Sequence, residues 1–171
     1  DVGSGKTFVA LMAMLTAIEA GAQAALLAPT EILARQHYQG LSKILKPLGL
    51  TPVLLSGSTK QKARQEILQG LADGSCQIAI GTHALLTDEV VFADLALAVV
   101  DEQHRFGVRQ RLVLGQKGKN CDVLVMTATP IPRTLAMTAY GDLTVSRLDE
   151  KPAGRQDLSL IHISEPTRRK H

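Results

Sequence analysis

The chain has few aromatic residues, with three Phe, two Tyr and no Trp among its 171 residues. Stacking of nucleic-acid bases on aromatic side chains is therefore not expected as a main binding device. The two cysteines, Cys76 and Cys121, lack CxxC spacing, which argues against a zinc site or a redox pair and fits a reducing, cytoplasmic compartment. No apolar run approaches the roughly 20 residues that a membrane-spanning helix needs.

The excess of positive charge is concentrated at the end of the chain. The net charge is +3, and residues 158–171 contribute +2 of it through Arg168, Arg169 and Lys170 against Glu165. Residues 1–157 are thus close to neutral, at +1. The overall charge therefore does not by itself indicate a nucleic-acid partner.

Short apolar runs alternate with helical patterns, and the length suits one domain. Buried strands separated by helices predict an α/β fold, a parallel sheet with helices on both faces. We expect helices over residues 6–20, 30–48, 132–139 and from a cap at Ser58 or Thr59 to about residue 72, and strands over 24–28, 52–55, 77–80, 97–100, 123–126 and 143–147.

The first seven residues contain most of a phosphate-binding P-loop, G-x-x-x-x-G-K-[ST]. Gly3, Ser4 and Gly5 would let backbone N–H groups surround phosphate oxygens, and Lys6 would reach the β- and γ-phosphates. The Thr7 hydroxyl would bind Mg²⁺. The leading Gly of the motif would stand before Asp1. We therefore expect the chain to be a piece of a longer protein that binds a nucleoside triphosphate, with the strand that enters the P-loop missing from this piece.

Acidic residues follow an apolar strand in the run Asp101-Glu102-Gln103-His104. Asp101 would hold Mg²⁺, and Glu102 would orient and deprotonate an attacking water. His104 would be either a satisfied surface histidine or a residue that couples the state of the nucleotide to the segment from Thr127 to Thr129. Two acids after a strand are usually a solvated corner, and the P-loop favours the catalytic interpretation instead.

Further polar clusters follow other predicted strands, where ligands gather in parallel sheets. Thr30 and Thr82 each stand where a helix begins. Their hydroxyls and the free N–H groups beside them suit a nucleic-acid phosphate, and a plain helix cap is an equally good interpretation. The candidate DNA-binding residues are Pro29, Thr30, Glu31, Gly81, Thr82 and His83. For His83 a packing or backbone-bonding role is the alternative.

Together these motifs resemble the first RecA-like motor domain of a superfamily 2 helicase. The runs from Asp101 to Val108 and from Thr127 to Thr134 are similar to those of the RecG-type DNA helicases. The resemblance covers residues 1–157. It implies a bacterial, cytoplasmic, monomeric ATP-dependent helicase that uses ATP and Mg²⁺ and migrates branched DNA, such as forks and Holliday junctions, in repair and recombination.

The resemblance also implies a division of the chain. Residues 1–150 would be the truncated ATP-binding domain, and residues 151–157 would begin a linker to a second motor domain. A wedge domain would recognise the junction. The second motor domain would supply an arginine finger, worth about 10³–10⁵ in rate in other phosphoryl-transfer systems. We therefore expect negligible ATPase activity from residues 1–171 alone.

The end of the chain has two interpretations. Residues 158–168 resemble a translated sequencing adapter, so residues 158–171 are expected to be an artefactual tail. The alternative is a genuine strand over residues 158–163, since apolar and polar residues alternate there.

Other functions remain open. The transcription-repair coupling translocase shares both long runs, but Ser4 and Gln103 favour the RecG type. A DEAD-box RNA helicase fits less well, because Gln103 and His104 replace its Ala-Asp. A truncated product that binds nothing is the non-enzymatic alternative.

Overall fold

The computed structural model describes residues 5–101, 113, 115–118, 121–127, 143–148 and 158–163. The elements within them follow one another along the chain as helix and strand in alternation, and then as strands. In chain order they are α1 (Gly5–Glu19), β1 (Gln23–Leu27), α2 (Glu31–Leu45), the 3₁₀ helix η1 (Lys46–Leu48), β2 (Val53–Leu55), α3 (Gln61–Asp73), β3 (Ile78–Gly81), the 3₁₀ helix η2 (His83–Leu86), β4 (Leu95–Asp101), β5 (Asp122–Thr127), β6 (Leu143–Leu148) and β7 (Leu158–Ile163).

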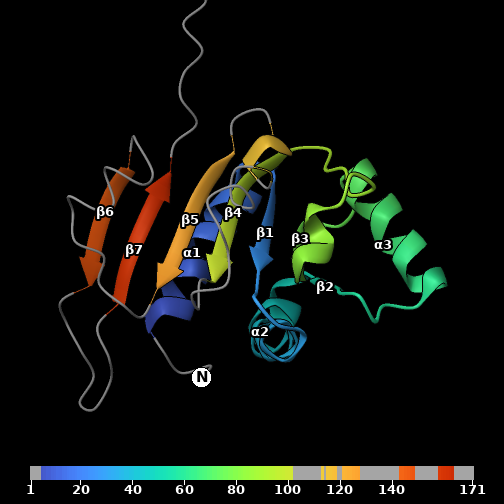
Figure 1. Cartoon of the computed structure of the whole chain (residues 1–171), viewed down its shortest axis with the longest axis horizontal. Coiled ribbons are helices and arrows are strands. Elements are labelled where there is room, and N and C mark those ends of the chain that lie inside the picture. The colour runs from blue at the N-terminus through green and yellow to red at the C-terminus, as the bar shows by residue number, and fades with distance from the viewer. Residues whose placement is uncertain are drawn as a thin grey trace, which may run out of the picture.

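The strands form one sheet in the order β2-β3-β1-β4-β5-β7-β6 (Figure 1). The first five in this order pair in parallel, as the α/β prediction requires. β7 departs from the parallel pattern, because it pairs antiparallel with both β5 and β6. The predicted fold class is confirmed for the five-stranded parallel part of the sheet.

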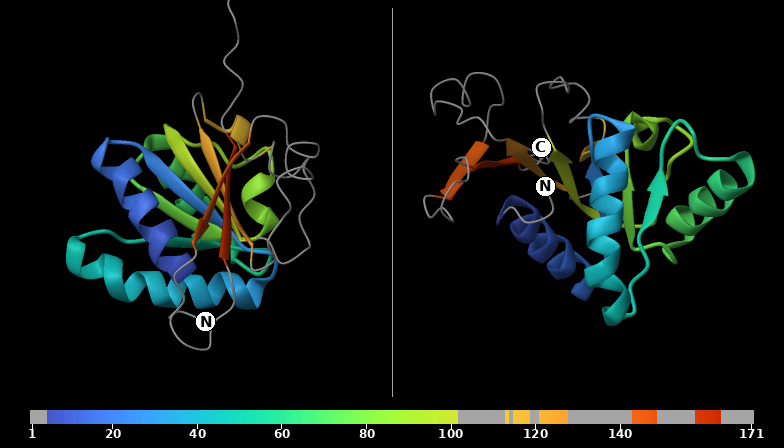
Figure 2. Two further views of the ribbon diagram at one scale, coloured as in Figure 1. Left: turned by 90° about the vertical axis from the view of Figure 1, so that its left-hand side faces the viewer. Right: turned by 90° about the horizontal axis from the view of Figure 1, so that it is seen from below.

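The central strands are buried on both faces. Every residue of β1 and of β3 is buried, which explains why these strands appear in the sequence as continuous apolar runs. One core cluster joins the sheet to α1 through Ala10, Leu11 and Met14, and the other joins it to α3 and η2 through Leu71 and Leu85. Helices therefore cover both faces of the sheet, while α2 lies across one edge (Figure 2).

The ends of the helices follow local chain chemistry. α1 ends at Glu19, just before Gly21, whose φ of +83° is a conformation that glycine adopts without strain. The helix predicted from residue 30 to 48 is in fact divided, because α2 ends at Leu45 and Pro47 lies in the 3₁₀ turn that follows. In the part of the chain that the structure describes, no helix combines the length and the apolar character needed to cross a membrane.

The predicted cap of α3 is wrong. The helix begins at Gln61, and its N-cap residue, Lys60, makes no side-chain capping bond. The Thr59 hydroxyl instead accepts a hydrogen bond from the backbone N–H of Ser56 at 3.0 Å, and the Ser58 hydroxyl donates to Glu31. Both hydroxyls therefore shape the loop before the helix, and neither satisfies the N–H groups of its first turn.

Gln23 is a buried polar residue that ties three segments together. Its side-chain amide donates to the carbonyl oxygens of Leu71 at 3.0 Å and Cys76 at 2.8 Å. Its side-chain oxygen accepts from the backbone N–H of Asp94 at 2.8 Å. With 3% of its surface exposed, Gln23 connects the start of β1 to the end of α3 and to the start of β4.

Residues 158–163 form the strand that their alternating pattern predicts. The register pairs Val125 of β5 with Ile161, and Ile161 in turn with Val145 of β6. The expected strand at residues 143–147 is also present, as β6. The adapter origin of the tail and the boundaries at residues 150 and 157 stay predictions, and the helix expected at residues 132–139 lies outside the described residues.

Candidate active site

The parallel register brings the ends of four strands to one edge of the sheet. Leu27 at the end of β1 pairs with Gly81 of β3 on one side and with Val100 of β4 on the other. Asp101 at the end of β4 pairs with Met126 of β5. The polar segments that follow these strands therefore leave the sheet at neighbouring positions, where ligands bind in open parallel sheets.

The start of α1 lies at the same edge, because α1 runs back along the sheet from the end at which β4 finishes (Figure 1). No acidic residue occupies its first turn, so the helix itself places no carboxylate beside the positive end of its dipole. Thr7 lies in this turn and is half-buried. Gly3, Ser4 and the side chain of Lys6 lie outside the described residues, and Gly5 is the first residue of the helix.

Asp101 is the last residue of β4, and its side chain is 2% exposed. One of its carboxylate oxygens, Oδ2, lies 2.7 Å from Nε2 of His37, a residue of α2 whose side chain is 13% exposed. Since an ionised carboxylate only accepts hydrogen bonds, the ring N–H of His37 is the donor. Glu102, Gln103 and His104 lie outside the described residues.

Thr30 caps α2. Its backbone is extended, with φ −135° and ψ 157°, and its hydroxyl accepts a hydrogen bond from the N–H of Leu33 at 3.2 Å. The structure therefore shows Thr30 as the N-cap of α2. The remaining N–H groups of the first turn of α2 lie beside it, so the DNA-binding role of Thr30 and of the neighbouring Pro29 stays a prediction.

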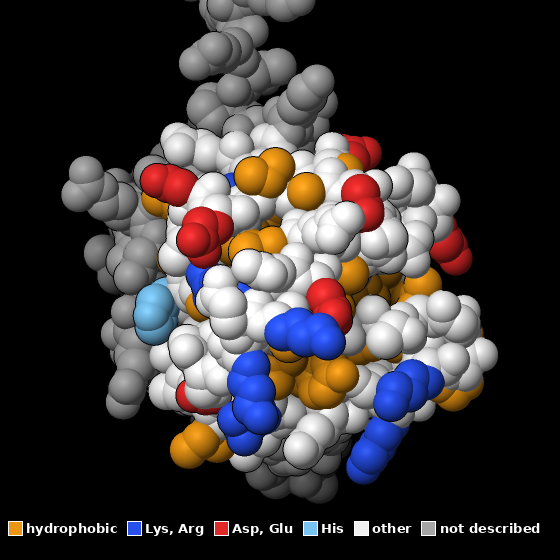
Figure 3. Space-filling view, turned by 90° about the vertical axis from the view of Figure 1, so that its right-hand side faces the viewer, with side chains coloured by type: hydrophobic (Ala, Val, Ile, Leu, Met, Phe, Trp, Pro, Cys, Tyr) orange, Lys and Arg blue, Asp and Glu red, His pale blue; other side chains and the backbone are white. Residues whose placement is uncertain are grey.

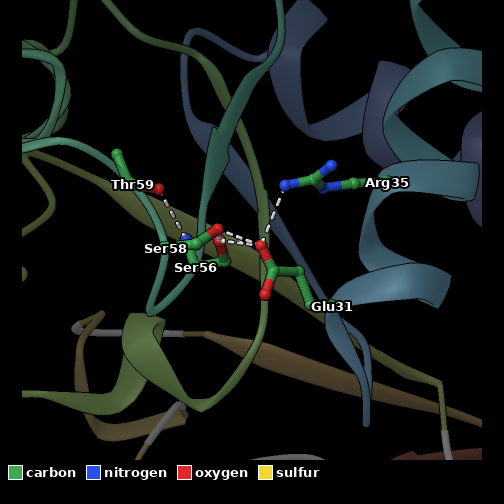
Figure 4. Close-up of polar contacts among 5 residues, drawn as sticks. All are labelled: Glu31, Arg35, Ser56, Ser58 and Thr59. Atoms are coloured by element: carbon green, nitrogen blue, oxygen red, sulfur yellow. Dashed lines mark hydrogen bonds and ion pairs between the residues drawn. The ribbon is translucent and has the colours of Figure 1, made fainter.

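Glu31 lies in the first turn of α2 and joins it to the loop before α3 (Figure 4). Its carboxylate accepts hydrogen bonds from the hydroxyls of Ser58 and Ser56, the latter at 3.2 Å, and from the guanidinium of Arg35 at 3.1 Å. The hydrogen bond from Ser58 is the largest cause that lowers the pKa of Glu31 below its ordinary value, and burial opposes it. An ionised carboxylate held in this way suits a structural clamp better than direct contact with a DNA phosphate.

The segment from Gly81 to His83 combines buried and exposed positions. Gly81 and Thr82 are buried, while His83 is exposed. The Thr82 hydroxyl accepts from the N–H of Ala84 at 3.4 Å and caps η2, so the capping interpretation holds here too. Of the three, His83 is the residue whose side chain can meet a ligand from solvent, and the DNA-binding role of the segment stays a prediction.

Charged side chains are unevenly spread on the face over β2 and α3. On the side shown in Figure 3, Lys and Arg side chains gather in the lower half, towards the edge at which the parallel strands end. Most of the Asp and Glu side chains on this face lie in its upper half. A concentration of basic side chains near this edge is compatible with contact to a polyanion there.

The coupling residues are only partly described. Thr127 ends β5, next to β4, so its backbone lies beside the end of the strand that carries Asp101. The side chain of Thr127 and the whole of Thr129 lie outside the described residues. Sequence reasoning missed the partner of Asp101, since no local pattern connects His37 with a carboxylate 64 residues further along the chain.

Comparison with known proteins places this geometry in a family. The family model described as "DEAD/DEAH box helicase" matches residues 1–138. The chain belongs to the DEAD/DEAH box helicases. The family match confirms the predicted resemblance to the motor domain of a superfamily 2 helicase.

The relatives most useful for comparison are named ATP-dependent DNA helicase RecG. The present chain is 55% identical over 172 aligned residues to the RecG of Pasteurella multocida, and the alignment covers 98% of this chain and 25% of the relative. It is 56% identical over 158 residues to the RecG of Streptococcus pneumoniae, covering 92% and 23%. The chain thus spans about a quarter of the length of these curated relatives.

Solved structures agree with this placement. The structure of RecG bound to a three-way DNA junction is similar at 45% identity with a TM-score of 0.72, over 91% of this chain and 21% of that one. The helicase MrfA bound to DNA and AMPPNP is similar at 22% identity with a TM-score of 0.62, over 81% and 22%, which shows a shared fold. Both structures are described as bound to DNA.

Proposed function

We propose that this chain is the ATP-binding motor domain of a RecG-type DNA helicase that migrates branched DNA in repair and recombination. The observation that supports this most directly is the position of the start of α1 and the buried Asp101 at one edge of the sheet. The high identity to RecG proteins supports the choice among helicases. The RecG structure that contains a three-way DNA junction supports branched DNA as the partner.

The residues at the edge fit a magnesium-bound nucleotide. The first turn of α1 contains no acidic residue, as suits a helix start that binds phosphate, and Asp101 presents the carboxylate oxygens that Mg²⁺ prefers. Lys6, with Gly3, Ser4 and Gly5, would bind the phosphates, and Thr7 and Asp101 would hold the cation. When bound, Mg²⁺ neutralises charge that develops on the phosphates.

The remaining site residues have roles around that nucleotide. Glu102 would orient a water and accept its proton. His104, Thr127 and Thr129 would transmit the state of the nucleotide to the rest of the motor. The segments Pro29–Thr30 and Gly81–His83 would contact DNA phosphates, and Glu31 would hold the first of these segments in place.

The proposal extends to partners of the motor domain within a longer, bacterial and cytoplasmic protein. A second motor domain would complete the ATPase site, and a wedge domain would recognise the junction. Residues 1–171 alone are therefore expected to hydrolyse ATP at least about 10³-fold more slowly than the intact motor. A coupled ATPase assay on both would measure this difference.

The test uses a chimera in which residues 1–157 replace the matching segment of the Pasteurella multocida RecG. We expect ATP hydrolysis that forked DNA stimulates, and a loss of at least about 100-fold in Lys6→Ala and Asp101→Asn. Gln69→Ala, an exposed and uncharged position on α3, is the control and should keep full activity. Stimulation by a stalled transcription complex and not by forked DNA would favour a coupling translocase, and full activity in Asp101→Asn would refute the proposed site.

A further inference from the structure

The contact between His37 and Asp101 joins two parts of the chain that no motif connects. His37 lies within α2, and Asp101 ends β4 in the middle of the sheet. Their Nε2 and Oδ2 atoms are 2.7 Å apart, a short distance typical of a charge-assisted hydrogen bond. Both side chains are largely buried, with 13% and 2% exposed, so water competes weakly for the contact.

The surroundings of Asp101 explain why such a partner matters. A carboxylate that is almost fully buried requires hydrogen bonds to remain ionised, and its orientation is set by those bonds. Metal-binding carboxylates are commonly held by a second residue that does not touch the metal, and loss of that residue weakens metal binding about 10- to 100-fold. The ring of His37 is in position to hold one oxygen of Asp101 in this way.

α2 gives the ring of His37 a rigid base. The helix has 15 residues, is capped by Thr30, and lies across the edge at which the parallel strands end (Figure 2). His37 follows Thr30 by seven residues, about two turns, so the two positions lie on the same side of α2 and roughly 10 Å apart along it. Ala34, one turn before His37, is fully buried and anchors this side of the helix.

We propose that His37 is a positioning residue that holds the Asp101 carboxylate in the orientation in which it binds Mg²⁺. This inference rests on the proposed function of Asp101. His37 itself touches neither the metal nor the nucleotide. Its effect should therefore appear in the affinity for Mg²⁺, while the binding of nucleotide without Mg²⁺ and the binding of DNA at the start of α2 should stay unchanged.

The test compares His37→Leu, which has no donor, with His37→Gln, whose side-chain amide can donate from nearly the same place. Gln36→Leu is the control, since Gln36 is exposed on the same helix. In the chimera, the binding of a fluorescent ATP analogue is titrated with Mg²⁺, and the DNA concentration for half-maximal ATPase is measured in parallel. Thermal melting of each variant reports on folding.

We expect His37→Leu to raise the Mg²⁺ concentration for half-maximal nucleotide binding by about tenfold or more, with the DNA half-saturation within about twofold of the parent. His37→Gln should recover most of the Mg²⁺ affinity, and Gln36→Leu should match the parent. An unchanged Mg²⁺ titration in His37→Leu would overturn the inference and leave the proposed function intact. Equal damage in both His37 variants, with a lowered melting temperature, would also overturn it in favour of a packing role.

A different result would refute the proposed function itself. If the parent chimera bound the ATP analogue equally well with and without Mg²⁺, Asp101 would not be a metal ligand. The proposed role of His37 in orienting a metal ligand would then be refuted as well.

Discussion

Gly81 lies directly against the backbone of Leu55, because the carbonyl oxygen of Leu55 accepts a hydrogen bond from the N–H of Thr82 at 3.2 Å. A Cβ atom at position 81 would collide with that carbonyl oxygen and would also press on the side chain of Leu85. The glycine in this predicted DNA-binding segment is thus required by the packing of β3 against β2.

Gly81→Ala is therefore expected to destabilise the protein by about 1–3 kcal/mol, since backbone must move to admit the methyl group. Gly57→Ala is the matched control, because nothing lies within 4 Å of the Cβ it would add. Its effect should stay within about 0.5 kcal/mol. Urea unfolding followed by circular dichroism measures both, and equal midpoints for the two variants would contradict the packing argument.

Glu31→Gln tests the clamp between α2 and the loop before α3. The hydrogen bonds from Ser58 and Ser56 and the charge of Arg35 lower the pKa of Glu31 in the folded protein. The clamp therefore stabilises the fold at a pH above the ordinary glutamate pKa of about 4.3, and this contribution is lost as the pH falls through the lower, folded value.

The advantage of the parent over Glu31→Gln should therefore be present at neutral pH and should vanish in acid. Melting temperatures measured from pH 7 down to about pH 3 would show this as a converging pair of curves. Glu66→Gln, at an exposed position of α3, serves as the control. A gap between parent and Glu31→Gln that did not depend on pH would speak against the clamp.

Gln23→Met tests the buried network at the start of β1. The variant keeps much of the side-chain volume and removes three hydrogen bonds, to Leu71, Cys76 and Asp94. The buried partners would lose their bonds, at a cost of about 1–3 kcal/mol for each group left unsatisfied. We expect a loss of at least about 2 kcal/mol in urea unfolding. Gln69→Met, on the exposed side of α3, should be nearly neutral.

Thr30→Asp separates the capping role of Thr30 from its predicted contact with DNA. Aspartate is as good an N-cap as threonine or better, so the stability of α2 should be kept or raised. A phosphate beside the cap would be repelled by the new carboxylate. We therefore expect an unchanged melting temperature and a weaker affinity of the chimera for forked DNA, measured by fluorescence anisotropy.

Thr30→Ser should preserve both properties, and Thr30→Ala should cost about 1 kcal/mol of stability. If Thr30→Asp bound forked DNA as tightly as the parent, Thr30 would be a cap and nothing more. The three variants at position 30, compared with the parent, thus distinguish the two interpretations that the sequence leaves equally open.

Local sequence patterns determined the order of the helices and strands and the position of the candidate site motifs. Buried strands such as β1 and β3 form continuous apolar runs, and Gly21 ends α1, so the alternation of helices and strands was predictable from short-range chemistry. The candidate P-loop and the acidic pair beginning at Asp101 could be proposed for the same reason, because each is a few adjacent residues whose spacing predicts that chemistry.

Tertiary structure decided what depends on distant segments meeting. The hydrogen bond from His37 to Asp101, the use of the Ser58 and Thr59 hydroxyls away from the α3 cap, and the place of β7 between β5 and β6 each join residues with no common local pattern. A hydroxyl or an imidazole can satisfy its hydrogen bonds locally or across the fold, and the choice depends on which groups packing brings within reach.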